Sequence, residues 1–393
     1  MTLRNIPEVR RKGAAMLLAA ALSVCGCVNK VGDYGSDSRK EPVYFNVPVV
    51  SPTRTAPGAA NTEIGQNYDT REHFSVYAID QDRPFADLTP ALLERYFMQN
   101  LECAYNSSVN GWTPLVQYFW PPFSDGAFYL SFQAYSPSVA EEDMTTLGHD
   151  WTNGFTFSGF SPRAAGQQYD LLFTDIHKDK QRAHYSPEPG YPYDDSSPNP
   201  YMGIDLNFRH ALTSIAFKIR ANVDENALQT VRLQSIRIVQ AWDKATFAQN
   251  IGGTPSWTPD VDASETSYYA YRNTGAVTDG VQLTATDFCI PNAMLLIPQA
   301  LDHTSTGHHV RIEVSYSRTT GGSTTVSTDT IDLVTGNGDN YYQYIDEDNN
   351  LVDIDSWKIG YRYTYRFTIN LFKIFVDPSV DPWSDYGGID MDI

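Results

Sequence analysis

The strongest constraint on the fold of this chain is an alternation of apolar and polar residues with a period of two. It is clearest near the C-terminus, where one set of alternate positions is aromatic or aliphatic and the set between them is polar. The apolar set is Tyr363, Tyr365, Phe367, Ile369 and Leu371, and the polar set is Arg362, Thr364, Arg366, Thr368 and Asn370. Successive side chains of a β-strand point to opposite faces, so this pattern predicts a strand with one buried face.

Similar patterns predict a chain made almost entirely of strands. Alternation or short apolar runs occur at 43–50, 74–79, 128–135, 204–209, 215–219, 231–239, 310–316 and 331–334. One helix is predicted where Thr89 can cap its start and Pro90 can occupy its first turn. Its apolar side would consist of Leu92, Leu93, Tyr96 and Phe97. Strands joined by turns, with few helices between them, predict an all-β fold of antiparallel β-sandwiches.

The length of the chain predicts two domains. A chain of 393 residues exceeds what a single hydrophobic core usually supports. The stretch 185–201 contains five prolines and shows no apolar period, which is typical of a boundary. We therefore predict an N-terminal β-sandwich domain at 43–200 and a C-terminal β-sandwich domain at 201–393.

The N-terminus has the layout of a signal peptide. Arg10, Arg11 and Lys12 precede an apolar run from Ala14 to Val24. This run is too short to span a bilayer, and no later stretch approaches the roughly 20 apolar residues of a membrane helix. We expect residues 1–26 to be removed and the mature protein to have no transmembrane helix.

The end of the apolar run, Val24-Cys25-Gly26-Cys27, resembles the bacterial lipobox, in which a small residue precedes the Cys that is acylated. Cys27 follows Gly26 and fits, whereas Cys25 follows the bulky Val24. We therefore predict that Cys27 carries the lipid and that residues 27–42, rich in polar residues, form a flexible tether. Acylation of Cys27 leaves Cys103 and Cys289 as the only other cysteines of the mature chain, and we expect both to be buried free thiols.

The first strand, 43–50, has an unusual composition. Its apolar positions are Val43, Phe45, Val47 and Val49. Pro48 between them cannot donate to a ladder of hydrogen bonds, so we expect an edge or terminal strand. A loop at 51–70 follows the strand and contains Arg54.

The charge of the chain argues against nucleic acid as a partner. Its formal net charge is −19, from 28 basic and 47 acidic residues. A negative surface repels phosphate backbones and anionic lipids.

A search for catalytic or cofactor motifs gives a negative result. The chain has no G-x-S-x-G elbow, no H-E-x-x-H, no C-x-x-C and no G-x-x-x-x-G-K, so we expect neither an enzyme nor a bound cofactor. His308 and His309 have no nearby ligand partners in the sequence. The acidic run 346–350 matches the start of a calcium loop, but Leu351 stands where that loop needs Gly, which favours a solvated turn. We therefore expect no metal site.

A series of short motifs runs in order from about residue 43 to residue 383. In the first half these are Trp112, Tyr118-Phe119-Trp120-Pro121 and the segment 130–137 (LSFQAYSP). In the second they are 169–172 (YDLL), 206–215 (LNFRHALTSI), 295–299 (LLIPQ), 357–363 (WKIGYRY) and 380–383 (VDPW). Together they resemble the fimbrillins of the Bacteroidales.

The resemblance implies two transthyretin-like β-sandwich domains and a structural or adhesive subunit of a type V fimbria. Such a subunit is exported as a lipoprotein to the outer membrane and assembles at the cell surface with other pilus subunits, as a homopolymer or heteropolymer. A host or bacterial surface ligand is a further class of partner. In that family a protease cuts after an Arg beyond the first strand, and a C-terminal strand of a neighbouring subunit fills the vacated groove.

Carried onto this sequence, the resemblance makes Arg54 the site of proteolytic processing. Val43, Phe45, Val47 and Val49 become the core face of the displaced strand. An ordinary first strand beside an ordinary loop Arg is the competing interpretation. The strand at 363–371 and the tail after Trp383 are the candidates for the donated strand.

One alternative function is a surface glycan-binding lipoprotein. Exposed Tyr and Trp side chains can stack on sugars, but a β-sandwich also uses such residues in its core, and the chain has 25 Tyr. Composition does not separate the two possibilities, and saturable binding of a polysaccharide would favour the alternative.

Overall fold

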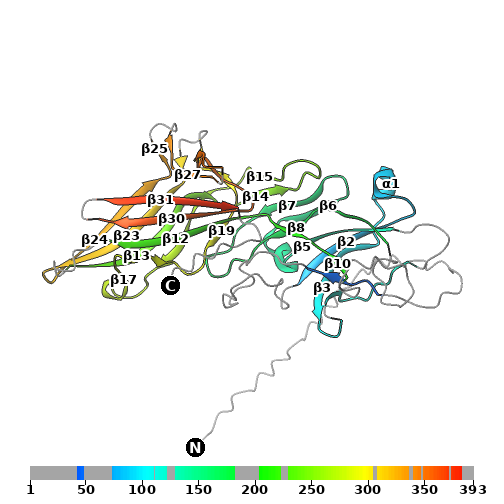
Figure 1. Cartoon of the computed structure of the whole chain (residues 1–393), viewed down its shortest axis with the longest axis horizontal. Coiled ribbons are helices and arrows are strands. Elements are labelled where there is room, and N and C mark those ends of the chain that lie inside the picture. The colour runs from blue at the N-terminus through cyan, green and yellow to red at the C-terminus, as the bar shows by residue number, and fades with distance from the viewer. Residues whose placement is uncertain are drawn as a thin grey trace, which may run out of the picture. The chain divides into compact units, whose positions relative to one another are not determined.

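The computed structural model describes residues 42–47, 73–109, 111–121, 129–181, 203–222, 229–303, 308–335, 340–346, 348–370 and 373–382. All of them belong to a compact unit that begins at Arg39. The structure confirms the predicted fold class, because the described chain is nearly all-β (Figure 1).

The first sheet is curled, and the strands at its two ends follow one another in the sequence. In spatial order its strands are β10 (Ile204–Asp205), β1 (Phe45–Asn46), β4 (Gly111–Pro114), β3 (Met98–Asn106), β2 (Phe74–Gln81), β5 (Tyr129–Ser136), β8 (Leu172–Thr174) and β11 (Phe208–His210), with β9 (His177–Lys180) also paired to β5. The two end strands, β10 and β11, are separated in sequence only by residues 206 and 207. The inner face of the curled sheet therefore encloses an apolar cluster.

A second sheet packs on the outer face of the first. Its order is β15 (Ser256–Pro259), β14 (Ala245–Ala248), β7 (Gly154–Phe160) and β6 (Thr146–Asp150). Tyr77 and Tyr135 of the first sheet meet Phe155 and Phe247 of the second in one buried cluster. The second sheet thus combines strands from both halves of the sequence. The domain boundary near residue 200 remains a proposal, since residues 182–202 lie outside the described part of the chain.

Two further sheets face each other and are called here the C-terminal sandwich. One has the order β18 (Phe288–Cys289), β12 (Thr213–Ala221), β30 (Tyr361–Ile369) and β31 (Ile374–Pro382), with β19 (Met294–Leu296) also paired to β12. The other has the order β16 (Glu265–Arg272), β13 (Gln229–Trp242), β23 (Arg311–Thr320) and β24 (Ser323–Asp332), with β17 (Val281–Leu283) also paired to β13. The strand that opened the sequence analysis is β30, and its apolar face from Tyr363 to Ile369 is buried as predicted.

Short elements complete the described fold. Four two-stranded ladders join β20 (Gln299–Ala300) to β29 (Ser356–Trp357), β21 (Asp302–His303) to β22 (His308–His309), β25 (Val334–Thr335) to β26 (Asn340–Tyr341), and β27 (Gln343–Ile345) to β28 (Leu351–Asp353). The 3-10 turns are η1 (Phe85–Asp87), η2 (Ser138–Asp143) and η5 (Val277–Asp279). None of the helices in the described ranges is long and apolar enough to cross a membrane.

The predicted helix begins where expected but is shorter. Helix α1 spans Pro90–Leu93, with Thr89 as its N-cap residue and Pro90 in its first turn. It stops early because the backbone N–H of Phe97 donates to the carbonyl of Ala78 in β2, which draws the chain into β3. Tyr96 and Phe97 therefore lie beyond the helix.

The expectation for the cysteines holds for one residue and is wrong for the other. Cys103 is a buried free thiol, whereas Cys289 is exposed. The reason is the alternation of β18, in which Phe288 packs on the core of the C-terminal sandwich and its neighbour points to the other face.

Candidate functional site

The first strand lies inside the core of the first sheet. Val43, Phe45 and Val47 are at most 1% exposed, and all three belong to the cluster enclosed by the curled sheet. They are three of the four residues predicted to form the core face of this strand. The fourth, Val49, lies outside the described residues, as do Arg54 and Cys27.

Aromatic contacts anchor the middle of this segment. The ring of Phe45 meets Phe132 of β5 and Phe74 of β2 edge to face, with centroids 5.4 Å and 5.9 Å apart. Such pairs add about 0.5–1.5 kcal/mol to the burial of area. In the order of the sheet, three strands separate β1 from β5. The ring of Phe45 therefore bridges opposite sides of the curled sheet.

Backbone hydrogen bonds hold the segment on both sides. Phe45 is opposite Trp112 of the antiparallel β4 and opposite Ile204 of the parallel β10. The N–H of Ile204 donates to the carbonyl of Tyr44 at 2.9 Å, and the N–H of Leu206 donates to that of Asn46 at 2.8 Å. We call the surroundings of β1, formed by β4, β10 and the enclosed cluster, the strand groove.

Of the two alternatives predicted for this strand, an edge or a terminal strand, the edge strand is wrong, because β1 has a neighbour on each side; it is the first strand of the described chain. The edge prediction was based on Pro48, which lies beyond the two residues of β1. The chain returns at 203–206 and pairs with the side of β1 that would otherwise be open. A partner from more than 150 positions along the chain is invisible to a local pattern.

Two glycines allow the backbone of β1 to approach its neighbours closely. A Cβ atom at Gly203 would lie 2.7 Å from the carbonyl carbon and oxygen of Tyr44, and the φ of Gly203 is +75°. A Cβ atom at Gly111 would lie 3.0 Å from the carbonyl oxygen of Phe45. Sequence reasoning missed both residues, although a glycine in a strand, such as Gly111 in β4, is a known signal of close backbone approach.

Burial of the first strand accounts for a large part of the stability of this region. A fully buried aliphatic or aromatic side chain contributes about 1.5–3 kcal/mol, so Val43, Phe45 and Val47 together contribute about 5–9 kcal/mol. This is an upper estimate, because unfolded chains already bury some apolar surface. Whole domains have net stabilities of about 5–15 kcal/mol. Loss of the segment would therefore leave an apolar groove that needs a replacement.

A buried His–Asp pair lies where the first sheet meets the C-terminal sandwich. His210 Nδ1 is 2.7 Å from Asp170 Oδ2, and both side chains are almost fully buried. Burial raises the pKa of Asp170, while the nearby His210 lowers it. These residues belong to the 169–172 and 206–215 motifs, so the motifs meet in space. The pair links the segment just before β8 to the last residue of β11, shortly before β12 begins.

Further hydrogen bonds hold this junction together. Gln168 donates its amide to the carbonyl of Leu295 and accepts the N–H of the same residue, both at 2.9 Å and both buried. The indole of Trp257 donates to the carbonyl of Ala211 at 2.7 Å. The hydrogen bonds of Gln168 and Trp257 join neighbouring segments, so we interpret the junction as structural.

The described residues of the acidic run, 346 and 348–350, lie in a turn. The carboxylate of Asp346 accepts the backbone N–H groups of Asp348 and Asn350 and the side-chain amide of Asn350. These bonds close the hairpin of β27 and β28, so the carboxylate stabilises the turn. Within the described ranges, no group of three or more His, Cys, Asp or Glu side chains is placed to hold a metal ion.

Comparison with known families agrees with this architecture. Residues 53–383 match the model of the fimbrillin-like family. The match covers well over half of the chain, and the protein therefore belongs to the fimbrillin-like family. No curated protein sequence matches this chain.

Several solved structures are similar to this chain, and the first of those below shows the same fold. A fimbrial protein from Bacteroides vulgatus is 16% identical with a TM-score of 0.51, and the match covers 79% of this chain and 93% of that one. A protein assigned to cell adhesion from Bacteroides uniformis is 15% identical with a TM-score of 0.46, covering 89% and 100%. The tip fimbrial protein Mfa3 from Porphyromonas gingivalis, with a C-terminal truncation, is 10% identical with a TM-score of 0.35, covering 87% and 100%.

Proposed function

We propose that this chain is a structural or adhesive subunit of a type V fimbria, exported as a lipoprotein and assembled at the cell surface by strand exchange. The observation that carries the proposal is the burial of Val43, Phe45 and Val47 in the strand groove. A short segment near the N-terminus supplies a large share of a core, so its exchange for an equivalent strand would link subunits tightly.

Export to the outer membrane follows from the N-terminus. The signal peptide would be removed before Cys27, and acylation of Cys27 would anchor the precursor. Each buried methylene contributes about 0.8 kcal/mol to such an anchor, so several acyl chains hold firmly. Cleavage after Arg54 would then separate the folded body from both the lipid and the first strand.

Cleavage would leave the first strand held only by non-covalent contacts. A neighbouring subunit could then supply an extended segment that pairs with β4 and β10, by β-augmentation. Three apolar side chains at alternate positions are needed to replace Val43, Phe45 and Val47. The partners are therefore other copies of this chain or related pilus subunits.

The fold favours one of the two candidate donors. The described part of the strand predicted at 363–371 belongs to β30, which lies between β12 and β31 with its apolar face buried, so its removal would destroy the C-terminal sandwich. The tail after Trp383 ends in Ile389, Asp390, Met391, Asp392 and Ile393. Its three apolar residues alternate with two acidic ones, which matches the pattern of the first strand. We propose this tail as the donor.

The test is cleavage of the whole purified chain by an Arg-specific protease, followed by size measurement and N-terminal sequencing. Wild-type protein should be cut after Arg54 and form ordered multimers. Arg54→Lys keeps the positive charge but resists the protease, and it should stay monomeric. Met391→Asp should be cut normally and fail to polymerise, whereas Asp390→Asn should behave like wild type. A stable monomer after clean cleavage at Arg54 would refute strand exchange.

A further inference from the structure

Two pairs of exposed apolar side chains lie far apart in the sequence. We call Leu115 and Val116 the groove patch, and Ile345 and Leu351 the hairpin patch. Each of the four side chains is between 60% and 66% exposed. Single exposed apolar residues are normal on a protein surface, but neighbouring ones suggest a contact with another molecule. The position of each pair indicates what that molecule is.

The hairpin patch lies on the outer face of the hairpin of β27 and β28. Ile345 is opposite Leu351 in this antiparallel ladder, so the two side chains lie side by side on one face. Tyr344 lies on the other face and packs on the core of the C-terminal sandwich. Asp346 closes the turn by accepting the N–H of Asn350 at 2.7 Å. The hairpin therefore presents a defined apolar surface to solvent.

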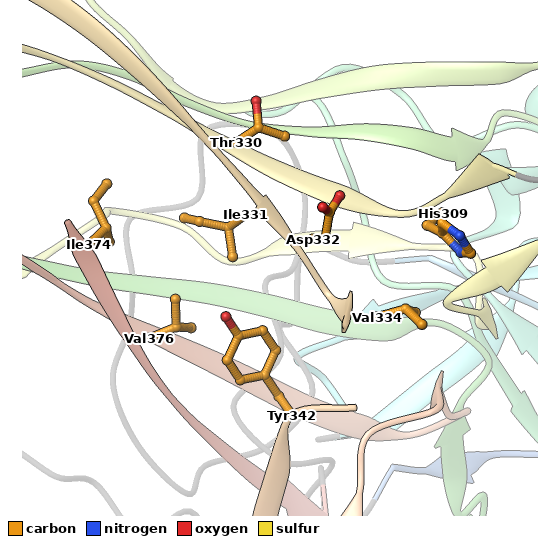
Figure 2. Close-up of a pocket in the computed structure, with 8 residues that line it drawn as sticks. All are labelled: His309, Thr330, Ile331, Asp332, Val334, Tyr342, Ile374 and Val376. Atoms are coloured by element: carbon orange, nitrogen blue, oxygen red, sulfur yellow. The ribbon is translucent and has the colours of Figure 1, made fainter. Parts of the chain in front are cut away.

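The hairpin stands beside the end of β31, where the tail begins. Tyr342, directly before β27, and Val376 of β31 line a pocket between the edges of β24 and β31, and Figure 2 shows the ring of Tyr342 beside Val376. Burial and the nearby Tyr361 raise the pKa of Tyr344. Tyr361 is opposite Pro382, the last residue of β31. The chain therefore enters the tail close to the hairpin patch.

The groove patch lies at one end of the strand groove. Leu115 and Val116 directly follow β4. The N–H of Leu115 donates to the carbonyl of Glu102 at 2.9 Å, which ties this segment to β3. Shortly afterwards, the carbonyl of Tyr118 accepts the N–H of Val43 at 2.9 Å. The patch therefore flanks the N-terminal end of the first strand.

The direction of the first strand decides which end of the groove faces a donor subunit. β1 runs antiparallel to β4 and parallel to β10. A donated strand that makes the same hydrogen bonds runs the same way, so the chain before Ile389 passes the groove patch. The segment from Pro382 to Ile389 can span at most about 25 Å. This short link keeps the hairpin patch of the donor near the groove patch of the acceptor.

We propose that the hairpin patch of each subunit packs on the groove patch of the next copy of this chain, as a second contact beside the exchanged strand. The inference rests on the proposed function and deepens it, because the tail is what brings the two patches together. Two small patches bury far less area than a stable free dimer needs. Linked by the exchanged strand, they meet at a high effective concentration, so a small contact is sufficient.

The lifetime of multimers tests this contact, using the whole chain after cleavage by the Arg-specific protease. Val116→Asp should disrupt the acceptor side of the joint, and Ile345→Asp should disrupt the donor side. Multimers of either variant should dissociate about tenfold faster than those of wild type, as expected when the burial of one apolar side chain is lost. An equimolar mixture of the two variants should give long-lived dimers, because only one pairing keeps both patches intact.

The matched control is Val261→Asp, which changes an exposed apolar residue outside both patches and should leave the lifetime unchanged. Circular dichroism checks that each variant is folded. A photoactivated carbene gives a second measurement: labelling of both patches should fall in multimers, whereas labelling of Val261 should not. If wild-type multimers form but neither patch variant dissociates faster than the control, or if both patches stay labelled, this contact is wrong and strand exchange stands. If wild type forms no multimers, both proposals are wrong.

Discussion

Replacement of Phe45 by Ala tests whether the first strand anchors the core. Phe45 is fully buried and its ring contacts Phe74 and Phe132. Truncation of such a ring costs about 3–5 kcal/mol, which combines lost transfer energy and the cavity left behind. This is a large fraction of the net stability of a domain. We therefore expect the first sheet to unfold at a markedly lower urea concentration in Phe45→Ala.

The matched control is Asn46→Ala in the same strand. The side chain of Asn46 points away from the core and donates to Asp205 at 2.7 Å in an exposed position, so its loss should cost about 1 kcal/mol or less. Equilibrium urea denaturation gives the free energies of unfolding, and hydrogen exchange locates the change.

Exchange should rise in β4, which pairs with β1, and stay unchanged in β23 of the C-terminal sandwich. If Phe45→Ala costs no more than Asn46→Ala, or if exchange rises equally in both strands, the strand is not the anchor of this core.

Three further predictions concern single residues. Gly203→Ala should lower the free energy of unfolding by about 1–3 kcal/mol, because it combines backbone strain at φ +75° with a clash on the backbone beside β1. The control is Gly166→Ala, at φ +89° in open space, which should lower it less in the same denaturation assay. Burial lowers the pKa of His149 from 6.5 to about 3, so below pH 6.5 the unfolded chain binds a proton that the folded chain does not. His177 has a similarly lowered pKa of about 4. Each of the two histidines should reduce the stability by about 1–2 kcal/mol between about pH 7 and pH 5, so His149→Gln should remove about half of the loss. Cys27→Ala should release the chain from membranes and abolish fatty-acid labelling, and a variant that still incorporates label would place the lipid elsewhere.

The sequence predicted the strands that have one buried face and clear alternation. β2, β5, β12, β13, β23 and β30 all lie where the apolar pattern placed them. Burial of Val43, Phe45 and Val47 was also predicted, because an apolar residue at every second position needs a core to face. Strands such as β15 and β24 were missed or only partly found, since most of their side chains are exposed and show no such period.

What the sequence by itself determined is the class of fold: local alternation makes strands, and Gly- and Pro-rich segments turn the chain between them. The tertiary structure alone decided which strands are neighbours. β10 pairs in parallel with β1, β14 joins β7 in the second sheet, and His210 meets Asp170. It also decided that the edges of β24 and β31 stand apart around a pocket. These features depend on contacts between residues far apart along the chain, such as Asn46 and Asp205, and a pattern that extends over a few residues carries no information about such partners.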